Sequence, residues 1–172
     1  MLIYKRARQE AKDIRKAYNV GSKGLGDLTT IAEVLGARVV VLPLRDGVSG
    51  MIDKAPDDEQ AVIYINSEDI AARQRFTLAH EIGHLVERQR VSGDDSYTFK
   101  DFRNPNGKYG LHEFFADEFA GELLMPDLEF MTDLIDNDFN YYATAARFGV
   151  TVAAVEKRSE RLRDQPPVEA NV

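Results

Sequence analysis

Residues 75–88 read "RFTLAHEIGHLVER" and hold two of the three histidines in this chain of 172 residues. His80 and His84 are four residues apart, and Glu81 follows the first, which completes an HExxH pattern. On an α-helix, residues i and i+4 lie one turn apart on the same side, so both imidazoles can bind one metal ion. Zinc is the metal that this pattern most strongly indicates, and Glu81 is placed to accept a proton from a water on it. The stretch therefore predicts the active site of a zinc hydrolase.

Apolar residues at helical spacing surround the motif, and no proline interrupts them. This pattern predicts a buried amphipathic helix whose polar residues face a cleft, and it disfavours the alternative of two ordinary histidines. Gly83 costs about 1 kcal/mol in a helix interior relative to alanine, so we expect something to pack closely there, such as a strand or a substrate. The apolar positions are Phe76, Leu78, Ala79, Ile82, Leu85 and Val86.

The composition indicates a single domain of ordinary size. The hydrophobic content of 44% is enough to fill one core, and we expect a domain over residues 1–163 followed by a disordered tail over residues 164–172. The absence of cysteine excludes disulfides and thiolate–zinc sites, so any metal must have nitrogen and oxygen ligands.

The charge and the N-terminus limit the classes of partner. A net charge of −7 argues against general binding to nucleic acid, which needs clustered Lys and Arg. The N-terminus lacks the apolar segment of a secretory signal, and no run is long enough to span a membrane, so we expect a cytoplasmic protein.

Residues 141–162 have the outline of a helix-turn-helix, which leaves DNA binding as a minor alternative. The basic cluster near the end of the chain consists of Lys157, Arg158, Arg161 and Arg163.

The remaining periodicity predicts an α+β fold. Strands are expected at residues 37–44, 48–53 and 60–66, in a small three-stranded, mostly antiparallel sheet packed against the HExxH helix. Gly50 marks either a bulge or a simple irregularity in the middle strand. Residues 89–110 have no period and predict a long loop, either a lid over the cleft or a passive insertion. Helices are expected at residues 4–18, 28–36, 75–88 and 111–125 and on both sides of a Gly149 turn with a Thr151 cap.

A catalytic zinc has three protein ligands and one open position, so the HExxH pattern leaves one ligand to find. Glu113 and Asp117 are one turn apart on the helix at 111–125, and their carboxylates point the same way. Glu113 would bind the metal, and Asp117 would accept a hydrogen bond from the far nitrogen of a ligating histidine. His112 is the rival ligand, but it lies about 100° around the helix from Glu113. These ligand types suit manganese as well as zinc.

Two separate motifs resemble those of the ImmA/IrrE family of zinc metallopeptidases. "RFTLAHEIGHLVE" (residues 75–87) matches the HExxH helix, and "EFFADEFAGELLMP" (residues 113–126) matches a helix that reads E-x-x-A-x-x-F-A and ends in L-L-M-P. The resemblance extends from about residue 27 to residue 160 and implies a minimal zincin-like fold. It also implies that His80, His84 and Glu113 are the zinc ligands and Glu81 the general base. The family often has asparagine where this chain has Asp117.

The resemblance further implies a regulatory role. Members are similar to cytoplasmic regulators, encoded in bacteria and on mobile elements, that relieve repression by inactivating a helix-turn-helix repressor of the Xre type. We therefore expect a zinc-dependent, site-specific endopeptidase that cleaves such a repressor in a mobile-element, toxin–antitoxin or stress-response circuit. The alternative is a zinc-binding regulator that inactivates the repressor by binding it. Four tyrosines are candidates to stabilise the oxyanion of the reaction: Tyr97, Tyr109, Tyr141 and Tyr142.

Overall fold

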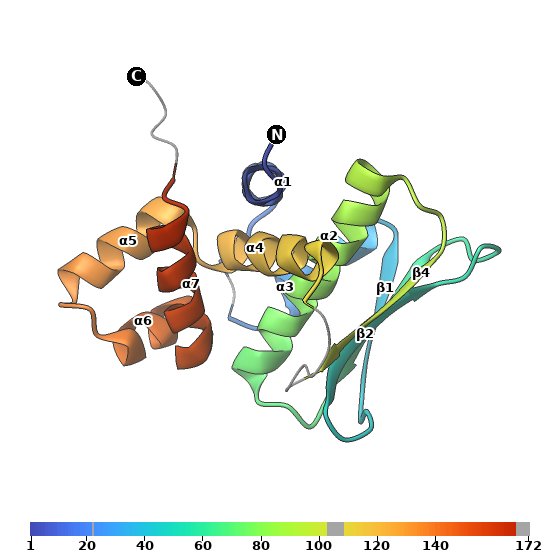
Figure 1. Cartoon of the computed structure of the whole chain (residues 1–172). Helices are drawn as coiled ribbons and strands as arrows, with labels where there is room; N and C mark the ends of the chain where they lie inside the picture. Colours follow the sequence, from blue (N-terminus) through green and yellow to red (C-terminus); the bar gives the residue numbers. More distant parts are fainter. Residues whose placement is uncertain (22, 103–108, 168–172) are drawn as a thin grey trace.

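The computed structural model describes residues 1–21, 23–102 and 109–167, and it has a mixed α+β architecture (Figure 1). The elements in chain order are α1 (Ile3–Ala17), α2 (Gly26–Val34), β1 (Ala37–Leu42), β2 (Val48–Lys54), β3 (Ala61–Asn66), α3 (Ala71–Glu87), a π-helical turn η1 (Arg88–Ser92), β4 (Tyr97–Phe102), α4 (Leu111–Leu124), α5 (Asp127–Asp136), α6 (Tyr141–Phe148) and α7 (Val152–Asp164).

The sheet has four strands in the order β1-β3-β2-β4, which corrects the expected three. β1 and β3 are parallel, whereas β2 is antiparallel to both β3 and β4, so the sheet is mixed. After β1, the chain first forms β2, which is not the neighbour of β1. It then forms β3 between β1 and β2, and β3 runs parallel to β1. The pairing of β2 with β4 shifts between Val48 and Gly50, where the extra residue on β2 forms a β-bulge.

β4 lies within residues 89–110, so the prediction of a continuous loop there was wrong. Tyr97 and Phe99 are half-buried, whereas Thr98 and Lys100 are exposed, which is the alternation of a strand with one covered face. This alternation is short and lies among Gly, Asp and Asn residues, and these turn signals outweigh it in the sequence. Residues 103–108 of the predicted loop lie outside the described residues.

The core is built in layers on one face of the sheet. α3 packs on β2 and β3, α4 packs across α3, and α1 packs on α4 (Figure 1). The layers meet through side chains that are fully buried, and this packing fixes how far α3 and α4 rotate about their axes. Among these side chains are Ile52, Ile63, Ile65, Leu78, Ile82, Leu85, Phe115, Phe119 and Leu123.

Gly83 lies where α3 and α4 are closest together. A Cβ atom built at Gly83 would lie 2.9 Å from Cα of Ala116 and 3.1 Å from its carbonyl oxygen. We expected a strand or a substrate at this position, but the neighbour is the backbone of a second helix. The absence of a side chain at Gly83 therefore determines the spacing between α3 and α4.

α5, α6 and α7 form a helical group beside α4. Gly149 ends α6 with a φ of 65°, and the Thr151 hydroxyl accepts a hydrogen bond from the backbone N–H of Ala154 at the start of α7. The expected turn and cap are thus confirmed. α7 ends at Asp164, and residues 168–172 of the predicted tail lie outside the described residues.

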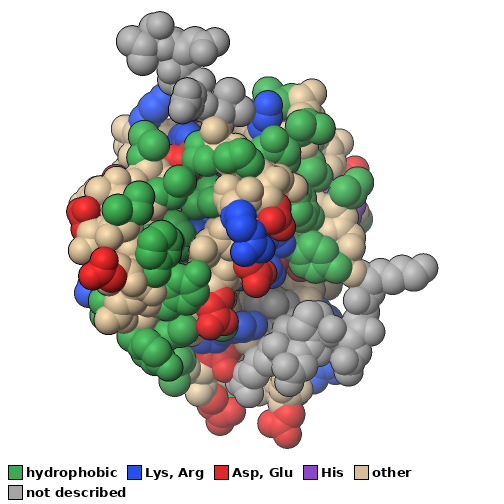
Figure 2. Space-filling model, turned by 60° about the vertical axis from the view of Figure 1, so that its left-hand side comes forward, with side chains coloured by type: hydrophobic (Ala, Val, Ile, Leu, Met, Phe, Trp, Pro, Cys, Tyr) green, Lys and Arg blue, Asp and Glu red, His purple; other side chains and the backbone are tan. Residues whose placement is uncertain are grey.

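α5 and α6 carry an unusually apolar surface, which we call the outer apolar face. Figure 2 shows hydrophobic side chains gathered on this side of the molecule, with acidic side chains at its edge. No helix in the described part of the chain is long and apolar enough to cross a membrane. The exposed apolar residues of this face are Leu128, Met131, Ile135, Phe139 and Tyr142.

Candidate metal centre

α3 presents His80 and His84 on the side that faces α4. Their side chains are almost fully buried, with relative exposures of 4% for His80 and 1% for His84. Their Nε2 atoms lie 3.1 Å apart. The opposite side of the helix carries Leu78, Ile82 and Leu85 into the core, so packing directs the two imidazoles toward α4.

Glu113, at the start of α4, completes a three-residue cluster. One carboxylate oxygen lies 3.2 Å from Nε2 of His80, and the other lies 3.2 Å from Nε2 of His84. Ligand atoms that bind a tetrahedral ion at about 2.0–2.1 Å lie about 3.3 Å from one another. Two imidazole nitrogens and a carboxylate at these separations therefore fit a divalent metal ion. Among the described residues, this is the one group of three or more His, Cys, Asp or Glu side chains arranged to hold a metal.

The protonation states of two of these residues suit metal binding. Burial lowers the pKa of His84 to about 4, so its imidazole is neutral near pH 7. Burial by itself raises the pKa of Glu113, but its close contacts with His80 and His84 outweigh burial and lower this pKa to about 2. A neutral imidazole and an ionised carboxylate are the forms that bind metals.

Asp117 lies one turn after Glu113 and contacts the other nitrogen of His80. Nδ1 of His80 donates a hydrogen bond to Oδ1 of Asp117 over 3.0 Å. Burial by itself raises the pKa of Asp117, but hydrogen bonds from His80 and Lys157 outweigh it and lower this pKa far below its usual range. An ionised carboxylate at Nδ1 keeps the proton there and leaves the Nε2 lone pair directed at the cluster. The structure thus brings these two residues into the expected contact.

Glu81 is fully buried and lies against β2. A Cβ atom built at Gly50 would lie 3.2 Å from Oε1 of Glu81 and only 2.4 Å from Cγ2 of Thr77. Gly50 therefore lets β2 approach the side of α3 that carries the HExxH residues. The bulge at this point of β2 accompanies that approach.

Phe99 of β4 is a site residue that the sequence analysis missed. Its ring stacks on the imidazole of His84, with centroids 4.2 Å apart and an angle of 3° between the planes. The ring covers one face of a candidate ligand and limits its rotation. The alternation of Tyr97 and Phe99 with polar residues was the available signal, but it could not reveal which helix β4 would contact.

His112, the rival third ligand, points away from the cluster. Its Nδ1 lies 3.2 Å from Oε1 of Glu87, the guanidinium of Arg88 contacts its ring, and the side chain is 49% exposed. The rotation of about 100° between consecutive helical residues separates it from Glu113. The structure therefore brings Glu113 to the two histidines and leaves His112 outside the cluster.

The four candidate tyrosines differ in their surroundings. The hydroxyl of Tyr109 donates to Asp117 over 2.5 Å, whereas that of Tyr141 donates to Ser159 over 3.1 Å. Tyr142 is exposed on α6, and burial raises the pKa of Tyr97 to about 12. Within the described part of the chain, Tyr109 is thus the one of the four whose hydroxyl donates a hydrogen bond to a residue that contacts the cluster.

Several known proteins resemble this chain in sequence. A sequence profile described as the IrrE N-terminal-like domain matches residues 32–160. The radiation response metalloprotease IrrE of Deinococcus radiodurans is 39% identical over 89 residues, which are 52% of this chain and 24% of that protein. IrrE of Deinococcus deserti is 29% identical over 157 residues, which are 90% of this chain and 49% of that protein. The matched segments thus span about half the length of one relative and about a quarter of the other.

A solved structure has the same fold. It is a Mycobacterium tuberculosis transcriptional regulator with a TM-score of 0.67 and 17% sequence identity, and the match covers 95% of this chain and 48% of that one. The profile match contains His80, His84, Glu113 and Glu81, and a metallopeptidase family implies a divalent metal. Because the match covers most of the chain, this protein belongs to the ImmA/IrrE family of metallopeptidases.

Proposed function

We propose that this protein is a zinc-dependent endopeptidase, with His80, His84 and Glu113 as the zinc ligands and Glu81 as the general base. The observation that carries the proposal is the convergence of two imidazole nitrogens from α3 and the two carboxylate oxygens of Glu113 from α4, at separations of 3.1 and 3.2 Å. A purely structural metal site has no need of a general base, so the intact HExxH glutamate favours hydrolysis.

Each residue has a definite part in this reaction. Zinc, when bound, lowers the pKa of a water and polarises the carbonyl of the scissile bond. Glu81 accepts the proton of the attacking water and returns it to the leaving amine. Asp117 holds the Nδ1 proton of His80 and keeps Nε2 directed at the metal.

The substrate would bind as an extended strand along β4. Within the described residues, β4 is an edge strand, paired with β2 on one side only. The ring of Phe99 connects this strand directly to His84, so a peptide paired with β4 would pass close to the metal ligands. Backbone hydrogen bonds to a sheet edge bind a peptide with little dependence on its sequence.

We further propose that the physiological substrate is a helix-turn-helix repressor of the Xre type, cleaved at one site in the cytoplasm. Two relatives are named radiation response metalloproteases, and the structural neighbour is named a transcriptional regulator, which supports a protease that acts in gene regulation. The net charge of −7 suits a partner that is basic because it binds DNA.

The test compares Glu81→Gln with His80→Ala. The purified proteins are incubated with zinc and a candidate Xre-type repressor, and the mass of the repressor and the metal content of the protease are measured. We expect Glu81→Gln to keep about one zinc per chain and lose cleavage by at least about a hundredfold, and His80→Ala to lose both. Cleavage that persists in Glu81→Gln would exclude Glu81 as the general base.

The same incubation with the repressor bound to its DNA distinguishes the alternative function. Release of the repressor from DNA at full length by the wild-type protein would indicate inactivation by binding rather than by cleavage. Metal analysis of wild-type protein from cells grown with both metals would decide between zinc and manganese.

A further inference from the structure

Asp117 connects the metal cluster to α7, a helix about 40 residues further along the chain. One carboxylate oxygen, Oδ1, accepts the hydrogen bond from His80. The other, Oδ2, lies 2.5 Å from Nζ of Lys157 and 3.5 Å from the guanidinium of Arg161. Only 9% of the Asp117 side chain is exposed, so protein groups and not water surround the carboxylate.

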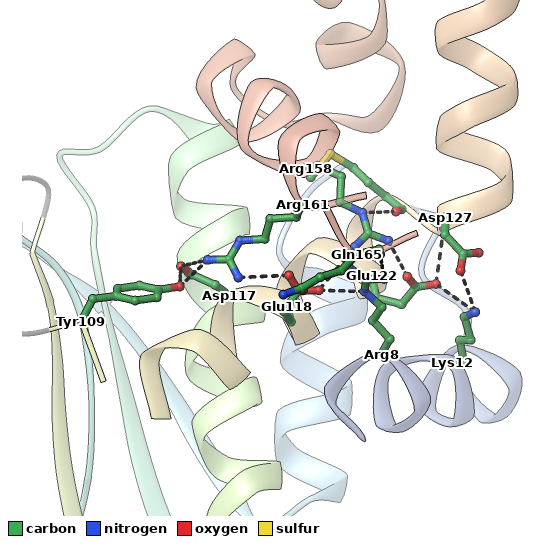
Figure 3. Close-up of polar contacts among 11 residues, drawn as sticks. Arg8, Lys12, Tyr109, Asp117, Glu118, Glu122, Asp127, Arg158, Arg161 and Gln165 are labelled. Atoms are coloured by element: carbon green, nitrogen blue, oxygen red, sulfur yellow. Dashed lines mark hydrogen bonds and ion pairs between the residues drawn. The ribbon is translucent and has the colours of Figure 1, made fainter. Parts of the chain in front are cut away.

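Arg161 is itself held firmly by several contacts. It donates to Oε1 of Glu118 over 3.0 Å and to the hydroxyl of Tyr109 over 2.5 Å (Figure 3). Its guanidinium also lies 4.6 Å from the ring centroid of Phe114. The Tyr109 hydroxyl in turn donates to Oδ2 of Asp117. Arg161 is therefore fixed relative to α4, because its partners Phe114 and Glu118 come before and after Asp117 on that helix.

Lys157 and Arg161 lie one turn apart on the same side of α7 and face α4. With Tyr109 they surround Oδ2 and leave Oδ1 available for His80. These contacts also account for two residues of the predicted basic cluster, while Arg158 is buried in a pair with Glu122. Three of the four residues considered for DNA binding thus contact carboxylates of α4.

We infer that Lys157 and Arg161 are positioning residues for His80, and that they act by holding the Asp117 carboxylate in place. This inference rests on the proposed metal site and assigns part of that site to α7. When either cation is lost, Oδ2 of Asp117 loses one of its partners, so the carboxylate that fixes the Nδ1 proton and the ring orientation of His80 is held less firmly.

Charge repulsion and positioning of His80 predict opposite changes in metal affinity when the cations are removed, which makes the inference testable. Two positive charges near a divalent cation oppose its binding, so their removal without any change in geometry would strengthen metal affinity. If Lys157 and Arg161 position His80, their removal weakens affinity. The sign of the change therefore separates the two explanations.

The experiment measures zinc affinity by competition with a chromophoric chelator for Lys157→Met, Arg161→Met and the double variant. We expect each single variant to bind zinc about 3- to 10-fold more weakly and the double variant about 10- to 100-fold more weakly. Lys157→Arg should restore affinity to within about twofold, because it keeps a donor at the same place. Arg163→Met is the control, because Arg163 is 74% exposed and pairs only with the neighbouring Asp164 among the described residues.

The visible spectrum of bound Co²⁺ provides a second measurement, because a general loss of protein stability would not change the position of its d–d bands. We expect the d–d bands of the double variant to shift in position or intensity, and those of Arg163→Met to match the wild type. Should the double variant fail to fold, Lys157→Met decides alone, since this side chain is 48% exposed.

Zinc affinity that is unchanged or higher in the variants, with an unchanged Co²⁺ spectrum, would overturn the role of α7 and leave the proposed function intact. Failure of the wild-type protein to bind zinc at all would overturn the metal site and this inference together.

Discussion

His84 is the most deeply buried of the three residues in the candidate metal cluster. It is enclosed by His80, Glu113 and the ring of Phe99, and its pKa is lowered to about 4. Near pH 7 no proton therefore has to leave before this imidazole can bind a metal. Enclosure by a ring also limits the orientations of the imidazole before the metal arrives, which reduces the entropy cost of binding.

Phe99→Ala tests this enclosure. We expect zinc affinity to fall about 2- to 10-fold, because a stacked ring pair contributes about 0.5–1.5 kcal/mol beyond its buried area. Chelator competition measures the change, and Lys100→Ala, on the exposed side of the same strand, serves as control. Equal affinities for the two variants would show that the ring has no part in holding His84.

Helical spacing predicted each half of the ligand cluster from the sequence, whereas the packing of α4 on α3 brings the two halves together. His80 with His84, and Glu113 with Asp117, each lie one turn apart within a single helix. The cations around Asp117 could not be predicted, since Lys157 and Arg161 reach it only through the packing of α7 on α4. Phe99 was missed for the same reason, because strand order decides which side chain meets His84.

At the scale of the elements, the distance between α3 and α4 sets the geometry of the site. The two histidines come from one helix and Glu113 from the other, so any separation of the helices pulls the three ligand atoms apart. The close contact between Gly83 and Ala116 keeps the two helices near each other.

Gly83→Ala should therefore impair both stability and metal binding. The added methyl meets backbone atoms of α4, which cannot rotate away, so we expect a loss of about 1–3 kcal/mol of unfolding free energy and at least about tenfold in zinc affinity. Urea unfolding of the metal-free protein and chelator competition measure the two effects. Gly26→Ala at the start of α2 meets nothing within 4 Å and should change neither. A Gly83→Ala protein with normal zinc affinity would show that the helices separate without moving Glu113.

The helices and three of the strands follow from local periodicity, but the sheet as a whole does not. β4 has few apolar positions and relies on its pairing with β2, so its own sequence carries a weak signal. The parallel pairing of β1 with β3 depends on the path of the connection that contains β2, and no local pattern encodes that path.

Across the whole molecule, a buried network of charges joins α1, α4 and α7. Glu118 and Glu122 of α4 are almost completely buried and face Arg8 of α1 and Arg158 of α7 (Figure 3). Lys12 and Asp127 extend the network toward α5. A buried charge is tolerated only when it is paired, so these helices have to pack together as a unit.

Arg158→Met is expected to destabilise the protein by about 3–5 kcal/mol, because it leaves Glu122 buried without its main partner. Combining it with Glu122→Met should recover part of this loss, since the unpaired carboxylate is then removed as well. Urea unfolding of the two single variants and the double variant measures the coupling. Additive losses in the double variant would show that the two residues do not interact.

The outer apolar face of α5 and α6 also governs how copies of the protein behave when they are concentrated. Leu128, Ile135 and Tyr142 are largely exposed there, while a net charge of −7 makes the molecules repel one another. That repulsion fades as the pH approaches the isoelectric point of about 5.0 or as salt is added. Colloidal stability is therefore greatest well above pH 5 at low ionic strength, and acidification or added salt is the natural route to precipitation and crystal growth.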